Sequence, residues 1–215
     1  MPGAAQSVRL TLFTAPLRLD RAGKIDPLKA NSAKSTPRKQ IRIGPAGWSY
    51  ADWQGIVYPS PKRRGFHEPA YLAQYFDTIE INTSFYQPLR PQLVRGWIEE
   101  IAFNPRFLFT AKLWQKFTHE ETATIDDEKS VRLGFDVLRD AGRLGAVLVQ
   151  FPFSFHSTPE TLAYLKRLAK RFQDYPLVVE VRHSSWNGRK LDTLFRELGV
   201  GFCNIDQPVI GRSVV

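Results

Sequence analysis

Residues 177–182 read Leu-Val-Val-Glu-Val-Arg, a short run in which branched apolar residues alternate with charged ones. Successive side chains of a β-strand point to opposite faces of its sheet. Val179 and Val181 would therefore share one face, while Glu180 and Arg182 share the other. The run predicts a strand with one apolar face and one face that ends in charged side chains. This pattern recurs along the rest of the chain.

Similar runs follow one another at regular intervals. Six segments rich in β-branched and aromatic residues cover residues 41–44, 77–82, 106–112, 146–150, 177–182 and 201–206. Five segments with apolar residues at helical spacing lie between them and cover residues 69–76, 91–102, 127–141, 158–172 and 189–198. Strands that alternate with helices form βα units, which build a parallel sheet with right-handed crossovers. The predicted fold class is therefore α/β.

The polar ends of these strands distinguish a barrel from an open sheet. The residues on the polar side are Glu80 and Asn82, Thr110 and Lys112, Gln150, Glu180 and Arg182, and Asn204 and Asp206. In a barrel such a row lines the lumen and converges at the C-terminal mouth, where barrel enzymes keep their active sites. In a doubly wound sheet helices cover both faces, so a polar row would be costly to bury. We therefore expect a TIM-barrel-like (β/α) repeat.

The basic charge of the chain is concentrated near its N-terminus. The net charge is +9 over 215 residues, and residues 1–40 carry eight Lys or Arg but only two Asp. This segment shows no sustained strand or helix period, and four prolines interrupt it. We expect a disordered basic leader over residues 1–40 and a barrel-like domain over residues 41–215. A basic tail attracts any polyanion, so nucleic acid could bind through the leader.

The sequence also bears on the cellular compartment. It holds one cysteine, Cys203, which excludes an internal disulfide framework. No apolar run approaches the roughly 18 residues of a membrane helix, and no apolar stretch that ends in a cleavage site marks a secretory signal. We expect no membrane partner and a cytoplasmic location. An organelle transit peptide and a misassigned start codon are alternative interpretations of the leader.

Several short blocks carry a resemblance to a known family. They are Ile-Gly-Pro-Ala-Gly-Trp-Ser-Tyr-Ala-Asp-Trp (43–53), Ile-Glu-Ile-Asn-Thr-Ser-Phe-Tyr (79–86), Phe-Thr-Ala-Lys (109–112), Leu-Val-Gln-Phe-Pro (148–152) and Val-Glu-Val-Arg-His-Ser-Ser-Trp (179–186). In this order they resemble the YecE-like domain of unknown function. The resemblance implies a TIM-barrel-like fold, and it supplies no reaction, cofactor or catalytic residue.

The resemblance also concerns the length of the domain. Proteins similar to this one usually continue well past the position of Asp206, whereas this chain ends at Val215. Residues 41–215 are fewer than the roughly 200–250 residues of a typical barrel. We therefore expect an incomplete, C-terminally truncated barrel of about six strands. Its open edge would favour self-association, and the oligomeric state is left open.

The strand ends supply the candidate site. Glu80 and Glu180 are predicted as general acid and base, since such chemistry uses two carboxylates in different environments. Lys112 is predicted to stabilise developing negative charge or to form a Schiff base. The predicted substrate-binding residues are Trp48, Asn82, Tyr86, Gln150, Arg182 and Asp206. Arg182 would clamp a carboxylate or phosphate, and the two aromatic rings would stack on a sugar or a base.

Two alternatives to this site remain open. The charged side chains could form an ion-pair network in the lumen that satisfies only itself. A divalent metal could be held by Glu80, Glu180, Asp206 and one histidine, although no two histidines have ligand spacing. The sequence requires no cofactor, and we predict no metal ligand.

The predicted function is an enzyme that uses acid–base chemistry, as a hydrolase, isomerase or lyase. Its substrate would be a small polar molecule, carbohydrate-like or anionic, bound at the C-terminal mouth of the barrel. One alternative is a non-catalytic nucleic-acid-binding module. It would use the leader and the Lys62-Arg63-Arg64 run, with Trp48, Tyr50 and Trp53 as stacking platforms. Another alternative is an inactive fragment.

Overall fold

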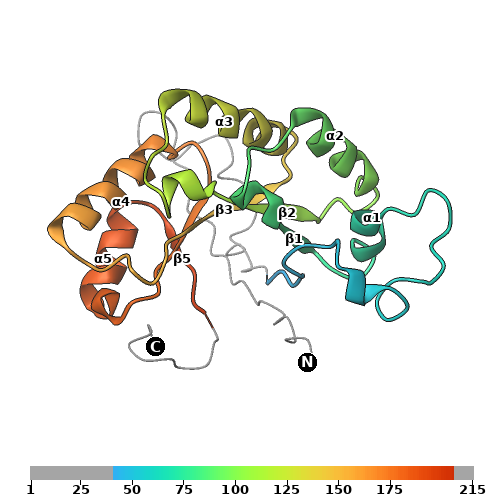
Figure 1. Ribbon diagram of the computed structural model, residues 1–215, viewed down its shortest axis with the longest axis horizontal. Helices are drawn as coiled ribbons and strands as arrows, with labels where there is room; N and C mark the ends of the chain where they lie inside the picture. Colours follow the sequence, from blue (N-terminus) through green and yellow to red (C-terminus); the bar gives the residue numbers. More distant parts are fainter. Residues whose placement is uncertain (1–40, 206–215) are drawn as a thin grey trace, which may run out of the picture.

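The computed structural model describes residues 41–205 (Figure 1). The predicted leader, residues 1–40, and Asp206 lie outside the described residues. The strands are β1 (Thr78–Ile81), β2 (Leu108–Lys112), β3 (Leu144–Gln150), β4 (Leu177–Glu180) and β5 (Gly201–Phe202). The α-helices are α1 (Glu68–Leu72), α2 (Pro91–Glu100), α3 (Ile125–Asp140), α4 (Pro159–Arg171) and α5 (Arg189–Glu197). Short 3-10 turns cover Ala51–Trp53 (η2), Asn82–Phe85 (η3), Gln115–Phe117 (η4) and Ser184–Trp186 (η5).

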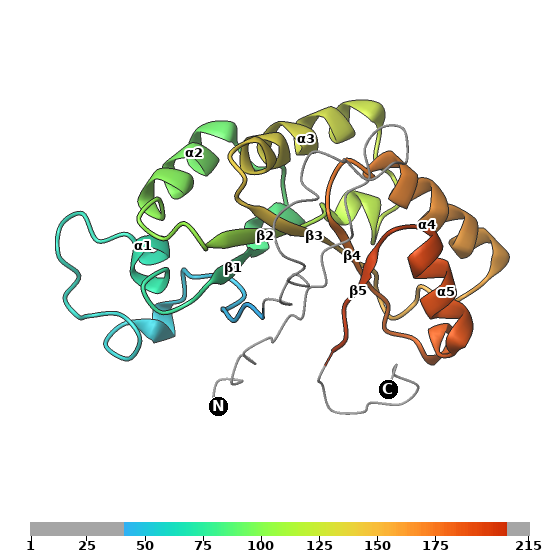
Figure 2. The same ribbon diagram turned by 180° about the vertical axis from the view of Figure 1, so that it is seen from behind.

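The described strands form one parallel sheet in the order β1-β2-β3-β4-β5. Each strand therefore pairs with the next one along the chain, without the reversal of strand order that marks a doubly wound sheet. The helices lie on one side of the curved sheet, as opposite views of the molecule show (Figures 1 and 2). Sequential parallel strands with helices outside form a TIM-barrel-like arrangement. The predicted fold class is confirmed.

The first predicted strand, residues 41–44, is replaced by a looser attachment to the edge of β1. The Glu80 amide donates to the carbonyl of Pro45 (3.0 Å), and Gly47 donates back to the carbonyl of Glu80 (2.8 Å). Within residues 41–47, Ala46 alone forms a bridge, which pairs it in parallel with Glu80. Proline has no N–H to donate, so a regular ladder stops at this position. The described residues therefore contain five strands and one edge segment.

A close backbone approach fixes this edge segment beside β1. A Cβ atom at Gly44 would lie 1.6 Å from the carbonyl oxygen of Thr78, well inside van der Waals contact. Gly47, three residues on, has a φ of 81°, which side chains other than glycine rarely adopt. Gly44 is thus required by the close approach to β1, and Gly47 by the turn that carries the chain into η2.

Capping residues set where the longer helices begin. Thr158 caps α4 by accepting from the Thr161 amide. The α3 helix begins at Ile125, two residues before its predicted start. Thr124 and Asp127 form a reciprocal capping box there. At the other end of the domain, α5 is followed by Gly199 with a φ of 64°, the left-handed conformation typical of a helix end.

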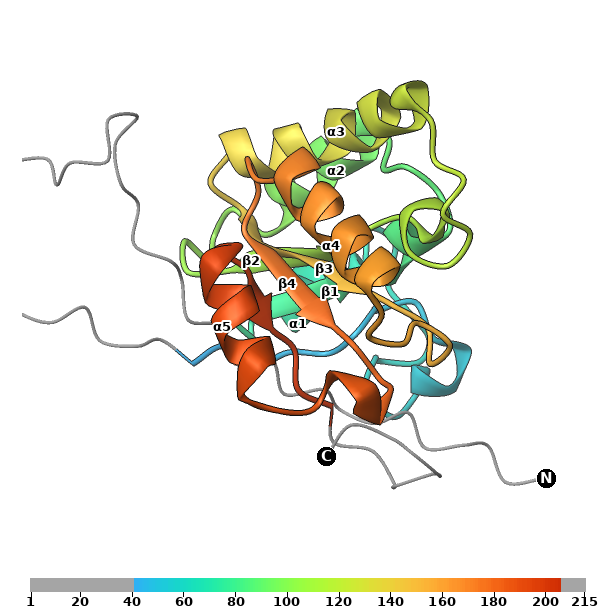
Figure 3. The ribbon, with the colours of Figure 1, turned by 90° about the vertical axis from the view of Figure 1, so that its left-hand side faces the viewer.

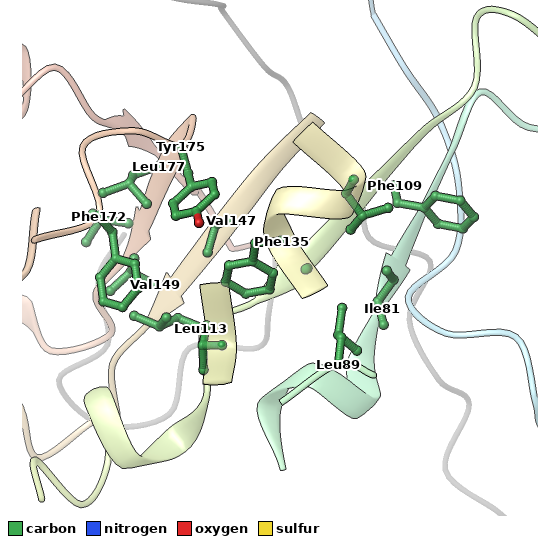
Figure 4. Packing of buried hydrophobic residues seen from close by; sticks show 14 of the residues in the cluster. Ile81, Leu89, Phe109, Leu113, Phe135, Val147, Val149, Phe172, Tyr175 and Leu177 are labelled. Carbon is green, nitrogen blue, oxygen red and sulfur yellow. The ribbon is translucent and has the colours of Figure 1, made fainter. Parts of the chain in front are cut away.

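The main core lies between the sheet and its helices. Large apolar side chains fill it, including Ile81 and Phe109 from the strands and Phe135 from α3 (Figure 4). The ring of Phe135 meets Tyr175 edge-on at 5.7 Å, which joins α3 to the loop before β4. Seen from the side, α4 and α5 cover the β4 end of the same face (Figure 3). Burial of this outer face supplies most of the hydrophobic stabilisation.

The inner face of the sheet is different in composition. Its apolar cluster is small and consists of Ala146, Leu148, Val178 and Cys203. These residues alternate with the outward-facing ones, so β1 to β4 have the predicted phase. The predicted phase of the last strand is wrong by one residue. Phe202 packs on Phe195 of α5, and Cys203, rather than Asn204, turns toward Glu180.

No helix in residues 41–205 is long and apolar enough to cross a membrane.

Candidate functional site

Two carboxylates lie at the C-terminal ends of the strands, on the inner face of the sheet. Glu80 of β1 reaches across to Lys112 at the end of β2, with 3.3 Å between Oε1 and Nζ. The register pairs Glu80 with Thr110, so Lys112 lies one inward-facing position farther along. Both side chains are mostly buried, with 11% of Glu80 and 17% of Lys112 exposed. The predicted association of these two residues is therefore present.

The second carboxylate, Glu180 of β4, is the centre of a hydrogen-bond cluster. The Gln150 amide donates to its Oε1 (2.7 Å), and the guanidinium of Arg182 contacts the same oxygen through Nε and Nη2, each at 2.9 Å. The Cys203 thiol lies 3.7 Å from its other oxygen. Register explains this arrangement, since Gln150 and Glu180 are directly paired across β3 and β4.

In both ion pairs the cation is the more exposed partner. Glu180 is fully buried, while 36% of the Arg182 side chain is exposed. Lys112 is also more exposed than Glu80, although the difference in exposed fraction is smaller. Burial lowers the pKa of Arg182, and the guanidinium remains charged because its ordinary pKa is so high. Each carboxylate thus holds a cation that is more accessible to solvent than the carboxylate itself.

Asn82 and Ser84 connect η3 to this group of strand ends. The Asn82 amide donates to the hydroxyl of Tyr50 (3.2 Å), which in turn donates to the Ala46 carbonyl. Ser84 is buried, donates to Ile81 and accepts from the backbone amide of Lys112 (2.8 Å). These bonds fix the turn after β1 against the end of β2 and so position Lys112.

The two predicted aromatic ligands, Trp48 and Tyr86, lie in different surroundings. The ring of Trp48 meets Trp97 of α2 edge-on at 5.0 Å and also contacts Phe109, so it packs in the core between sheet and helices. Tyr86 is exposed and touches Phe85, directly after η3. Packing therefore accounts for the Trp48 ring, while Tyr86 stays near the strand ends. Asp206 lies outside the described residues.

Histidines occur in the loops that follow β2, β3 and β4. His119 bonds to the Thr118 hydroxyl (2.9 Å) and lies edge-on to Phe85. His183 comes directly after Arg182, accepts from the Ser185 amide (3.1 Å) and stacks on His156 with ring centres 3.8 Å apart. Within residues 41–205, no three His, Cys, Asp or Glu side chains gather as metal ligands. The metal site considered from the sequence includes Asp206, which lies outside the described residues.

A family match covers the whole of this fold and site. Residues 42–215 match the family described as "Protein of unknown function DUF72". The chain belongs to the DUF72 family. The UPF0759 protein YunF of Bacillus subtilis is 29% identical over 155 residues, which cover 68% of this chain and 52% of YunF. The UPF0759 protein YecE of Escherichia coli K12 is 28% identical over 170 residues, which cover 74% of this chain and 55% of YecE.

Solved structures agree with this assignment. A DUF72 family protein from Thermotoga maritima is 27% identical, with a TM-score of 0.64 and coverage of 80% of this chain and 67% of the other. A DUF72 family protein from Enterococcus faecalis shares the fold, with 22% sequence identity and a TM-score of 0.54. The match covers 62% of this chain and 57% of the Enterococcus chain. This DUF72 chain spans about half the length of YunF and YecE. The predicted resemblance to a YecE-like domain is confirmed.

Sequence reasoning missed three features of this DUF72 site. Cys203, which the sequence did not mark as part of the site, lies beside the Glu180 carboxylate. The Tyr50 hydroxyl anchors Asn82, although the sequence suggested a stacking platform. Ser84 supports the end of β2 through its bond to Lys112. The alternation of apolar and charged residues in β4 predicts that Glu180 belongs to the site. No local pattern predicts the partners that come from segments far away in the sequence.

Proposed function

We propose that this DUF72 chain is part of an enzyme that performs acid–base chemistry on a small polar, anionic substrate at the C-terminal ends of β1 to β4. One observation supports the proposal most: two buried carboxylates each hold a cation, and in both pairs the cation is the more exposed member. A ligand that approaches these strand ends meets Lys112 and Arg182 before it meets either carboxylate. Negative charge on the ligand would complement this arrangement.

The roles follow from burial and bonding. Arg182 would bind the anionic group, because part of its guanidinium is exposed and its Nε and Nη2 are already oriented by Glu180. Glu180 was expected as an acid or base, but full burial and two donors to one oxygen fit a positioning role better. Lys112 and Glu80 would then transfer the proton, with Lys112 also stabilising negative charge that develops in the transition state.

The alternative of a nucleic-acid-binding module receives less support from the described residues. Lys62, in the basic run, bonds to Glu68 (2.6 Å) and lies over the rings of Tyr58 and Phe66. Trp53 packs against Tyr50 and Tyr58 rather than standing apart as a stacking surface. These contacts are those of a packed loop, so we keep the enzyme as the proposed function.

A ligand screen on the full 215-residue chain tests the proposal. Sugar phosphates, hydroxy acids and uncharged sugars are compared by thermal shift, and compounds that bind are followed by proton NMR for conversion. We expect anionic compounds to stabilise the chain and to be converted, and Lys112→Ala to abolish conversion. Lys129→Ala, in an exposed ion pair on α3, is the matched control and should behave as the wild type.

Three results would contradict the proposal. Equal stabilisation by uncharged sugars would remove the argument from the exposed cations. Binding without conversion of any anionic compound would argue for a binding module, and unchanged conversion by Lys112→Ala would remove Lys112 from the proposed chemistry. Circular dichroism of the variant separates loss of chemistry from loss of fold.

A further inference from the structure

Lys112 lies between two different neighbours at the C-terminal end of β2. On one side is β1, whose Glu80 carboxylate approaches Nζ to 3.3 Å. On the other side is β3, whose Leu148 is paired with Lys112 in the register of the sheet. Leu148 belongs to the small apolar cluster of the inner face. The ammonium group therefore has a carboxylate on one neighbouring strand and an apolar side chain on the other.

The backbone of Lys112 is fixed from two sides. Its amide donates to the hydroxyl of Ser84 (2.8 Å), and the next residue, Leu113, donates to the carbonyl of Leu148 (2.8 Å). Ser84 is itself buried and donates to the carbonyl of Ile81. A fixed backbone limits the positions that Nζ can reach. The amine is thus kept close to one carboxylate, which is the positioning that a reaction between bound groups requires.

A second lysine nearby in the sequence provides a contrast. Lys116 of η4 pairs with Asp127 (3.2 Å) and lies over the ring of Trp114, 4.5 Å from its centre. The exposed fraction of its side chain is 35%, compared with 17% for Lys112. Exposure alone would make Lys116 the more reactive of the two amines. A comparison of the two lysines therefore separates a reactive site from simple accessibility.

The surroundings of Lys112 provide the groups that imine formation needs. An amine attacks a carbonyl carbon only when it is neutral, so the ammonium must first lose a proton. Glu80 lies close enough to accept this proton, with 3.3 Å between Oε1 and Nζ. Leu148 assists, because an apolar neighbour favours the uncharged form of an amine.

We propose that Lys112 forms a covalent imine with the carbonyl group of its substrate, an aldehyde or ketone that also carries a phosphate or carboxylate. This inference rests on the proposed function for the negative charge of the substrate. It deepens that function by naming a carbonyl compound as the substrate class and by giving Lys112 a covalent role.

The step balances without a further reactant. Glu80 takes a proton from the ammonium, and the neutral amine adds to the carbonyl carbon while the electron pair of the C=O bond moves to oxygen. A proton then moves from nitrogen to this oxygen, which gives a carbinolamine. Glu80 returns its proton to the new hydroxyl, which leaves as water as the nitrogen lone pair forms the C=N bond. The products are a protonated imine and the Glu80 carboxylate.

The imine also narrows the type of reaction. Its positive nitrogen withdraws electrons from the neighbouring carbon atoms, so a proton or a carbon group is lost from them more easily. The bond to nitrogen is later hydrolysed by the reverse of its formation. Of the hydrolase, isomerase and lyase chemistries expected from the sequence, this arrangement favours an isomerase or a lyase.

Reductive trapping on the full 215-residue chain tests the inference. The probe is dihydroxyacetone phosphate, and sodium cyanoborohydride reduces an imine to a stable secondary amine. Peptide mass spectrometry then locates the adduct, which adds the mass of the probe less one oxygen atom. We expect Lys112 to be labelled at least about tenfold faster than Lys116, because positioned proton transfer accelerates such steps roughly 100-fold or more.

Three variants make the result specific. Lys112→Arg keeps a positive charge beside Glu80 but has no amine that can form an imine, so the adduct at this position should disappear. Lys116→Arg is the matched control and should leave the labelling of Lys112 unchanged. Glu80→Gln should slow the labelling of Lys112 by about tenfold or more if the carboxylate carries the proton. A carboxylate that only pairs with the charge would give the opposite result, because its removal favours the neutral amine. Circular dichroism checks that each variant is folded.

Three outcomes would overturn the inference. Lys112 could be labelled no faster than Lys116, it could be labelled faster in Glu80→Gln, or Lys112→Arg could still convert a substrate that the wild-type chain converts. The last result would remove the imine and leave Glu80 as the acid–base group of the proposed enzyme. Conversely, a failed search for substrate conversion would not alter the trapping measurements, so the two proposals fail separately.

Discussion

The two faces of the sheet differ in what their side chains do. The outer face carries large apolar residues that pack on five helices, whereas the inner face has a small apolar cluster and ends in ion pairs. Both faces come from the same strands, because successive residues alternate between them. Stability is thus concentrated on one face and polar chemistry on the other. Substitutions on the two faces should therefore have separable effects.

The largest effect is expected on the outer face. Phe109 of β2 is fully buried and contacts the rings of Phe107, Trp48 and Trp97. Phe109→Ala removes this ring and leaves a cavity, which should cost about 3–5 kcal/mol in the free energy of unfolding. Urea denaturation measures the loss. Leu133→Ala on α3, where the side chain is 59% exposed, is the control and should change the free energy by less than about 0.5 kcal/mol. Similar losses in both variants would contradict the assignment of the core to this face.

The inner face should show a smaller loss of stability and a larger loss of binding. Glu180→Gln keeps the shape of the side chain but replaces an accepting oxygen with an NH2 group beside Gln150 and Arg182. The unsatisfied donors should cost about 1–3 kcal/mol. Glu99→Gln, an exposed change on α2, is the matched control. The comparison of the faces would be wrong if Glu180→Gln left both stability and anion binding unchanged.

The alternating pattern explains why much of this arrangement was predictable. Strict alternation in β1 and β4 assigned Glu80 and Glu180 to the inner face, and the sequential order of strands follows from the repeated βα units. The pairings of Lys112 with Glu80 and of Gln150 with Glu180 follow from strands that end at one edge of a parallel sheet. These features depend on local periodicity, which a sequence displays directly.

Other features depend on contacts between distant segments. Trp48 follows a strand end, but its ring is placed by Trp97 of α2, 49 residues later. The prediction of which β5 residues face inward was wrong because two apolar residues, Phe202 and Cys203, occur in succession. Only packing on α5 decides which of the two faces inward. The place of His119 depends on a bond between Phe117 and Tyr164. No periodic pattern encodes such contacts.

Hydrogen bonds at the start of α3 extend the comparison to pH. Asp127, at the start of α3, accepts from the amide and hydroxyl of Thr124, which hold the pKa of the carboxyl below its ordinary value. A lowered pKa in the folded state stabilises the protein above the ordinary pKa of about 4, and this stabilisation is lost as the pH falls below it. Asp127→Asn should therefore lower stability at neutral pH, and its difference from the wild type should shrink near pH 3. Urea denaturation at the two pH values is the measurement. A difference that grows in acid would contradict the capping-box assignment.

The smallest effect is expected for an ion pair with no burial. Lys129 and Asp126 lie 2.8 Å apart on α3, but 71% and 88% of their side chains are exposed. Solvent screens such a pair and the two side chains lose rotamer freedom in forming it, so Lys129→Ala should change the free energy of unfolding by less than about 0.5 kcal/mol.

Lys112→Met at the strand ends removes a cation from a mostly buried pair and should cost more, because Glu80 then keeps a buried charge without its lysine. Equal costs in urea denaturation would mean that the strand-end pair is as well solvated as the surface pair. The argument that its cation is held ready for an anionic ligand would then lose its basis.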